Sequence, residues 1–408
     1  MNENTQKYTF IATTLFSSAI SFIKSYLFMD VLSKKDLGYI AIFQSIIAIV
    51  GFLQIGSITG GYRLVSFSKE RYKAANNTVV TFLIFLLSFT SIIIVYYSLI
   101  TNWNFFLILG IFVGIASLLT NWWSNLHIAL ERTKLLSILT FTSVLISLLF
   151  IPILYYNPLY GAILLIGAQP VSFILLSYFF NKDFHFKISF KSIIYFKLVI
   201  KYGFVPFFVG ILYYVNQQAE RWIIGYSLGV ESIGEYYLVF LYSTIFLVVP
   251  STLATVNFPN LMKFIRSNHI NKKSFIEIFG LYYLQLITYI IISFLLSYYL
   301  LPQLVGKFLP HHLIGVSFVK IIFWGLSIYT LVDPITFILN AKLHYKELIT
   351  IYLVSLIFSL TSYFYLYFNN LSSLTNFAYV NVIFFTCVAL GYILYFFVKG
   401  KNSLYIHD

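Results

Sequence analysis

Charged residues are scarce in this chain. They make up 10% of its 408 residues, whereas soluble globular proteins carry about 25%. A chain that is also 60% hydrophobic cannot cover a water-facing surface, so it needs lipid as its solvent. In lipid the backbone must satisfy its own hydrogen bonds, which leaves helices or a closed barrel. The apolar runs are continuous over about 20 residues and do not alternate as barrel strands do, which predicts transmembrane helices.

Cysteine and catalytic motifs are also lacking. The one cysteine, Cys387, lies inside an apolar run, so an intrachain disulfide and a cysteine-rich metal site are excluded. The chain has no HExxH, CxxC, GxSxG or glycine-rich phosphate loop. We therefore expect neither an enzyme nor a resident metal or cofactor. The first apolar run lacks a small-residue cleavage site, and we expect it to be retained as a helix.

Twelve apolar runs predict an all-α integral membrane protein of about twelve transmembrane helices in two six-helix bundles. The runs fall at about 8–31, 38–60, 78–100, 104–126, 135–156, 159–180, 203–224, 233–257, 275–298, 313–339, 348–368 and 373–398. The expected parts are an N-terminal bundle (1–180), a linker (181–202), a C-terminal bundle (203–398) and a cytoplasmic tail (399–408). The linker mixes apolar residues with lysines, which is typical of an amphipathic segment at a membrane interface; a plain loop is the alternative.

Basic residues outnumber acidic ones, 26 to 13, for a net charge of +13. In a soluble protein this excess would suggest nucleic acid. Here the basic residues lie between apolar runs, so we interpret them as orientation signals and expect no nucleic-acid partner. With the N-terminus inside, 20 of the 26 fall in cytoplasmic segments. A missed or extra helix would spoil this asymmetry, so it supports the helix count and places both termini in the cytoplasm.

The two halves show a weak internal repeat. Leu37-Gly38 and Ile233-Gly234 each open an apolar run, and the two pairs are offset by 196 residues. Six helices return the chain to its starting side, so the halves have the same orientation and form a parallel repeat about a pseudo-two-fold axis. Chance similarity between apolar sequences is the alternative.

A few ionisable residues lie within the apolar runs, where each costs about 2.5–3.5 kcal/mol on insertion scales. They should face a wet interior or pair with one another. The repeat offset places Lys24 opposite Glu220, so we expect these two side chains to face each other. Arg221 follows Glu220 directly and points about 100° away from it on a helix. Lys320 either faces the interior or extends to the outer interface.

Two further positions are candidates. Asp333 precedes Pro334 deep in a predicted helix, and because proline removes a backbone donor, we expect a kink suited to a gating helix; a paired structural charge is the alternative. Arg63 ends a glycine-rich run. It either meets a phosphate at the cytoplasmic mouth or anchors the helix end.

The segment 201–242 resembles the start of the second half of bacterial O-antigen and polysaccharide flippases (Wzx-type), which belong to the multidrug/oligosaccharidyl-lipid/polysaccharide exporter (MOP) superfamily. The matching residues are Gly203, Pro206, Glu220-Arg221, Gly229, Gly234 and Tyr236. Glutamate stands where aspartate is more usual in the family. The run Asp36-Leu37-Gly38-Tyr39 and the glycine-rich turn ending at Arg63 also fit, and the helix layout agrees over nearly the whole chain.

The resemblance implies a V of two bundles that opens alternately to each side. It implies a substrate that is an undecaprenyl-pyrophosphate-linked oligosaccharide, an O-antigen repeat unit, moved from the cytoplasmic to the periplasmic leaflet of the bacterial inner membrane. Membrane lipids and polysaccharide polymerase machinery would be its partners in lipopolysaccharide biosynthesis. The expected substrate-binding cations are Lys24, Arg63, Arg221 and Lys320; Glu220, Asp333 and Pro334 are the expected ion-coupling or gating residues, with H⁺ or Na⁺ as the coupling ion.

Two alternatives remain open at this point. One is a multidrug exporter of the same superfamily, for which a mainly acidic or apolar cavity is expected. The other is a membrane-embedded polysaccharide-processing enzyme, such as a polymerase or acyltransferase. A polymerase usually has one large outer loop, and the sequence contains no loop of that length.

Overall fold

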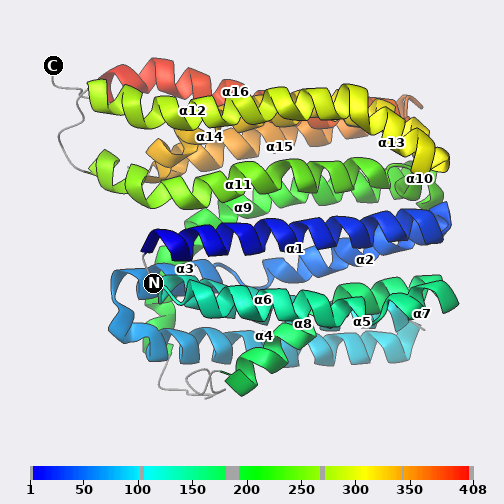
Figure 1. Cartoon of the computed structure of the whole chain (residues 1–408), viewed down its shortest axis with the longest axis horizontal. Helices are drawn as coiled ribbons and strands as arrows, with labels where there is room; N and C mark the ends of the chain where they lie inside the picture. The colour runs from blue at the N-terminus through cyan, green and yellow to red at the C-terminus, as the bar shows by residue number, and fades with distance from the viewer. Residues whose placement is uncertain (1–2, 102–104, 181–192, 267–271, 342–343, 404–408) are drawn as a thin grey trace. The chain divides into compact units, whose positions relative to one another are not determined.

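Long helices account for the described part of the chain. The computed structural model describes residues 3–101, 105–180, 193–266, 272–341 and 344–403, and no strand occurs among them. Figure 1 shows the helices of each half running side by side along their length. The predicted all-α class is confirmed. Eleven helical segments in the described residues are long and apolar enough to cross a membrane, and α1, Glu3–Val31, is a further helix of 29 residues. The protein is therefore a multi-pass membrane protein.

Several predicted single helices consist of two shorter helices in the structure. The first half contains α2 (Lys34–Phe52), α3 (Ser57–Phe67), a short 3₁₀ turn (Lys69–Arg71), α4 (Tyr72–Thr101), α5 (Phe105–Ala129), α6 (Thr133–Leu148), α7 (Ile151–Tyr156) and α8 (Pro158–Phe180). The break between α2 and α3 has a local cause: Ile55 and Gly56 have positive φ angles of 47° and 82°, a conformation that ends a right-handed helix.

The second half is built in the same way. It contains α9 (Ile193–Leu228), α10 (Val230–Glu235), α11 (Tyr237–Arg266), α12 (Lys272–Leu295), a π-helical turn (Leu296–Leu300), α13 (Leu301–Phe308), a 3₁₀ turn (Pro310–His312), α14 (Leu313–Ala341), α15 (Tyr345–Phe368) and α16 (Leu374–Ser403). Gly229, with φ of 90°, separates α9 from α10.

The chain divides into two compact units. Unit 1 comprises Met1–Leu32 and Tyr39–Ile211, and unit 2 comprises Ser33–Gly38 and Leu212–Asp408. The predicted linker falls partly at 181–192, outside the described residues, and residues 193–202 form the first turns of α9. The predicted tail begins within α16, which continues to Ser403. Each unit thus includes a short stretch of the other half of the sequence.

Each unit has its own buried core. In unit 1, α6 packs against α8 and α1, and α3 packs against α5. Trp122 and Trp123 are fully buried there, and the Trp122 indole donates a hydrogen bond to Asn76 Oδ1 at 2.9 Å. In unit 2, α14 packs against α16 and α11, with Phe323 and Phe384 almost wholly buried. Long apolar helices with a buried stripe on one side are what a membrane bundle requires.

Candidate functional site

Lys24 is a buried lysine on α1, in unit 1. Its exposed fraction is 5%, and its Nζ donates a hydrogen bond to Gln169 Oε1 on α8 at 3.2 Å. Gln169 is held next to Pro170, whose carbonyl accepts a hydrogen bond from Thr120 Oγ1 at 3.1 Å. Within the described residues Lys24 has no carboxylate partner. A buried ammonium needs compensation for its lost hydration, and a neutral amide supplies only part of it.

Glu220 lies at the centre of a buried polar network in unit 2. Its exposed fraction is 2%, and both carboxylate oxygens accept hydrogen bonds. Tyr236 donates its hydroxyl to Oε1 at 2.9 Å, and Asn381 Nδ2 donates to Oε2 at 2.8 Å. Tyr236 lies between α10 and α11, and Asn381 lies on α16, so these parts of the chain meet at one side chain of α9.

Further polar groups lie one helical turn from Glu220. Asn216 is fully buried on α9, and its Oδ1 accepts a hydrogen bond from Ser359 on α15. Asn216 Nδ2 and Asn381 Oδ1 are buried and make no hydrogen bond of their own. The network thus combines a carboxylate with an amide oxygen that has no donor. Such oxygens are the groups that bind hard cations.

Arg221 faces a different partner from Glu220, as the helical spacing predicts. Its guanidinium lies over the Phe240 ring, 4.4 Å from the centroid. Arginine over an aromatic face is a cation–π contact, which strengthens when it is shielded from water. Arg221 as a whole is intermediate in exposure, and its Nε atom is buried.

Asp333 and Pro334 lie within one continuous helix, α14. Asp333 Oδ2 accepts a hydrogen bond from the Tyr282 hydroxyl at 3.2 Å, and Thr336 Oγ1 donates to the Asp333 carbonyl at 2.6 Å. The Thr336 hydroxyl thus adds a side-chain hydrogen bond to the carbonyl of the residue that precedes Pro334. Among the described residues the side-chain partners of Asp333 are the hydroxyls of Tyr282 and Thr336, and both its gating role and its role as a paired structural charge stay predictions.

Lys320 lies against an aromatic cluster. Its Nζ is 5.3 Å from the centroid of the Tyr298 ring, and the Tyr298 hydroxyl accepts a hydrogen bond from Trp324 Nε1 at 2.8 Å. Tyr298 belongs to the π-helical turn. Such turns occur frequently at functional sites.

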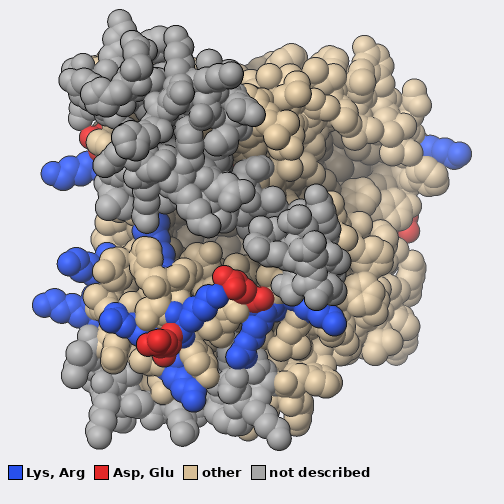
Figure 2. Space-filling model, turned by 60° about the vertical axis from the view of Figure 1, so that its left-hand side comes forward, with Lys and Arg blue, Asp and Glu red and all other residues tan. Residues whose placement is uncertain are grey.

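Arg63 lies within α3, one turn before the helix ends at Phe67, in unit 1. Its Nη1 donates to the Tyr202 carbonyl at 3.4 Å. Nearby, Lys69 pairs with Glu131 at 2.7 Å. Figure 2 shows Lys and Arg side chains gathered around a few Asp and Glu side chains on one face of the molecule. Arg63 is thus tied to the start of α9, in addition to any role with a phosphate.

The predicted residues fall into separate environments. Lys24 and Arg63 lie in unit 1, whereas Glu220, Arg221, Lys320 and Asp333 lie in unit 2. The predicted pairing of Lys24 with Glu220 stays a prediction. Sequence reasoning missed the partner residues, which are Gln169, Tyr282 and Asn381. A polar amide inside an apolar run was the available signal for Gln169 and Asn381.

Comparison with solved structures finds transporters with a similar arrangement of helices. Inward-facing and outward-facing structures of a multidrug resistance MATE family transporter of the MOP superfamily each match with a TM-score of 0.63. The inward-facing one is 12% identical, over 98% of this chain and 100% of the other. The outward-facing one is 11% identical, over 100% and 97%. A MOP superfamily transporter from Pyrococcus furiosus, described as having a binding pocket of reverse polarity, matches with a TM-score of 0.61 at 10% identity, over 100% and 97%.

The chain shares the fold of these transporters. No family model matches the sequence, and no curated protein matches it. The MOP fold agrees with the two-bundle architecture expected from the sequence, and at these identities the likeness establishes the fold alone. The side chains described above are therefore the basis for any statement about what is transported.

Proposed function

We propose that this protein is a transporter that moves an undecaprenyl-pyrophosphate-linked oligosaccharide from the cytoplasmic to the periplasmic leaflet by alternating access. The observation that carries the proposal is Lys24, a buried cation whose hydrogen-bond partner is the neutral Gln169. An anionic group such as a pyrophosphate would supply the negative charge that Lys24 lacks. The lipid tail can remain in the bilayer, whereas the pyrophosphate and sugars cannot cross hydrocarbon unaided.

We infer the orientation of the protein in the membrane from the distribution of its lysines and arginines. Lysines and arginines cluster on the segments that would be cytoplasmic if the N-terminus is inside. With this orientation, the end of unit 1 that carries Arg63 and the Lys69–Glu131 pair faces the cytoplasm. That is the side on which a lipid-linked substrate would load, and the expected membrane is the bacterial inner membrane.

We further propose that Glu220 binds the coupling ion, H⁺ or Na⁺. Its carboxylate is enclosed by Tyr236 and Asn381, and the free Asn381 Oδ1 adds an oxygen to the same site. Asp333, with Tyr282 as a partner, is the second candidate for ion coupling. Pro334 would let α14 bend beside it.

A multidrug exporter is the second candidate function. The observation in its favour is the pair of acidic side chains within the apolar helices of unit 2, Glu220 and Asp333, because cationic drugs are held by carboxylates. The binding pocket of reverse polarity described for the Pyrococcus furiosus transporter indicates that pocket charge separates functions on this fold. Lys24 argues for an anionic substrate.

A reconstitution experiment tests the proposal. The purified protein is placed in liposomes that carry a fluorescent undecaprenyl-pyrophosphate-linked oligosaccharide, and a membrane-impermeant quencher measures its transfer between leaflets. The same vesicles are tested for uptake of a cationic dye. We expect transfer of the lipid-linked sugar and no dye uptake. Dye uptake without lipid transfer would establish the exporter instead.

A further inference from the structure

The start of α2 and helix α10 touch backbone to backbone through two glycines. A Cβ atom added to Gly38 would lie 2.1 Å from the carbonyl oxygen of Val230, and one added to Gly234 would lie 1.8 Å from the carbonyl oxygen of Lys34. No side chain fits at these distances without moving a backbone. We name this contact, formed by Lys34, Gly38, Val230 and Gly234, the first crossing; all four residues belong to unit 2.

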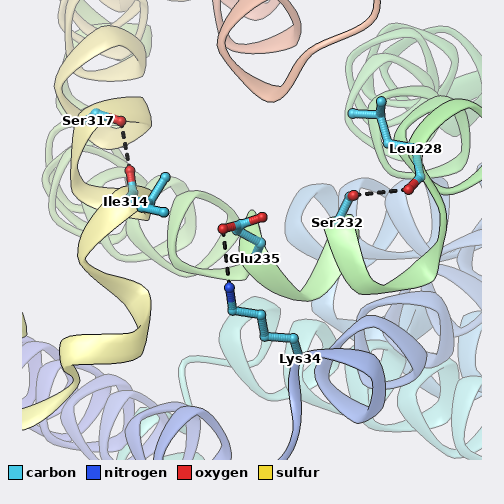
Figure 3. A network of polar contacts seen from close by, with 6 residues as sticks. All are labelled: Lys34, Leu228, Ser232, Glu235, Ile314 and Ser317. Carbon is cyan, nitrogen blue, oxygen red and sulfur yellow. Dashed lines mark hydrogen bonds and ion pairs between the residues drawn. The ribbon is translucent and has the colours of Figure 1, made fainter.

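The first crossing is reciprocal. Each glycine faces the carbonyl of the residue four positions before the other, and the repeat offset of 196 relates Gly38 to Gly234 and Lys34 to Val230. An ion pair lies beside it: Lys34 Nζ is 3.2 Å from Glu235 Oε1. Figure 3 shows the lysine side chain reaching from α2 toward the glutamate on α10. Two halves of a repeat meeting in this way form a symmetric, self-complementary contact.

A second contact of the same kind lies within unit 1. A Cβ on Gly60 would lie 1.8 Å from the carbonyl oxygen of Val199, and one on Gly203 would lie 1.9 Å from the carbonyl oxygen of Gly56. Here α3 packs against the beginning of α9, and Arg63 adds its hydrogen bond to the Tyr202 carbonyl. We name this contact, formed by Gly56, Gly60, Val199 and Gly203, the second crossing. Small residues four apart are what allow helix backbones to approach this closely.

The two crossings lie at opposite ends of α9. The second involves residues 199–203 near its start, and the first begins at Val230, just beyond its end at Leu228. A helix of 36 residues spans about 54 Å, more than the ~30 Å hydrocarbon core. One crossing therefore lies near each membrane surface. In the proposed orientation the first is periplasmic and the second cytoplasmic.

Each crossing adjoins a backbone junction suited to bending. Gly229, with φ of 90°, precedes the α10 side of the first crossing, and Ile55, with φ of 47°, precedes Gly56 of the second. A β-branched residue such as Ile55 rarely adopts positive φ, and such strain is retained where surrounding contacts impose it. Release of the second crossing would allow Ile55 to relax.

We propose that the two crossings are the closing contacts of two gates, one on each side of the membrane. This proposal rests on the alternating-access function proposed above. Flat glycine surfaces part and re-form without side-chain rearrangement. A partly exposed ion pair contributes little stability, which suits a contact that must break in every cycle. Lys34 and Glu235 would then bias the periplasmic gate toward its closed state.

Cysteine labelling tests this directly. In a Cys387→Ser background, Leu37→Cys reports on the first crossing and Ser57→Cys on the second, since both native side chains are fully buried. Whole cells and inverted vesicles are labelled with a membrane-impermeant maleimide. We expect Gly38→Val to increase labelling of residue 37 from the periplasm and decrease labelling of residue 57. Gly203→Val should do the opposite.

The charge variants keep the test decisive if the valine variants fail to fold. Lys34→Glu should raise periplasmic labelling of residue 37 about threefold, the population shift that a surface ion pair supplies. The double variant with Lys34→Glu and Glu235→Lys should return this labelling to its original level. The gate assignment would be overturned if labelling of residues 37 and 57 changed in the same direction. It would also be overturned if the double charge variant did not return labelling of residue 37 to its original level. The assay needs no substrate, so its outcome is separate from the identity of the transported molecule.

Discussion

Replacing Tyr236 by phenylalanine isolates one hydrogen bond to the buried carboxylate. Tyr236 is fully buried, and its ring lies 5.2 Å from Phe240 and 5.6 Å from Phe318. Phenylalanine keeps these contacts and removes only the hydroxyl that donates to Glu220 Oε1 at 2.9 Å. The change in the free energy of unfolding therefore reports on that bond.

The size of the effect depends on the charge of Glu220. Both of its oxygens accept hydrogen bonds in the structure, an arrangement that an ionised carboxylate satisfies in full because it is an acceptor only. A hydrogen bond to a charged group contributes about 1.5–3 kcal/mol, whereas a neutral interhelical bond in a membrane protein averages about 0.6 kcal/mol. We expect Tyr236→Phe to lower the free energy of unfolding by about 1.5–3 kcal/mol.

Equilibrium unfolding in mixed detergent micelles measures this change. In a Glu220→Gln background, the same substitution should cost only about 0.6 kcal/mol, because the acceptor is then neutral. Tyr155→Phe, at an exposed tyrosine, is the control and should have almost no effect. Equal losses in the wild-type and Glu220→Gln backgrounds would refute the reasoning that Tyr236 stabilises a charge.

Three further predictions concern other parts of the chain. Trp122→Phe removes the donor to Asn76 Oδ1 and should lower the free energy of unfolding of unit 1 by about 1–3 kcal/mol. Equilibrium unfolding in micelles measures this change, and a loss under about 0.5 kcal/mol would contradict a stabilising role for the hydrogen bond. Pro334→Ala restores a backbone donor within α14 and should raise stability while slowing transport in vesicles, so unchanged transport would remove the proline from the mechanism. Lys320→Gln should weaken binding of undecaprenyl pyrophosphate. It should change the free energy of unfolding by under about 1 kcal/mol, because the contact of Lys320 with Tyr298 is a cation–π pair. Unaltered binding would mean that Lys320 extends to the outer membrane interface instead.

Hydropathy was sufficient to predict the long helices. The run at 313–339 corresponds to α14 and the run at 348–368 to α15 within a few residues, because a membrane span requires a continuous apolar helix. The break at Ile55 was not predictable from hydropathy, since the run 38–60 is predominantly apolar on both sides of it. Isoleucine rarely takes positive φ, and packing of Gly56 against Gly203 is a tertiary effect that a local pattern does not contain.

The ionisable residues show the same limit. Their cost in hydrocarbon was enough to select Lys24 and Glu220 from the sequence. Their partners were not predictable, because Gln169 is 145 positions from Lys24 and Asn381 is 161 positions from Glu220. Such contacts depend on which helices pack together, which charge and hydropathy do not specify.

The transfer of lipid-linked sugar by Lys24 variants tests the central claim most directly. In liposomes that contain fluorescent undecaprenyl-pyrophosphate-linked oligosaccharide, Lys24→Gln should reduce transfer at least about tenfold, the effect of losing ~1.4 kcal/mol of substrate stabilisation. Lys24→Arg should retain most of the transfer, and Lys134→Gln, at an exposed lysine, should match the wild type. Full transfer by a folded Lys24→Gln variant would contradict the claim that this buried cation serves an anionic substrate.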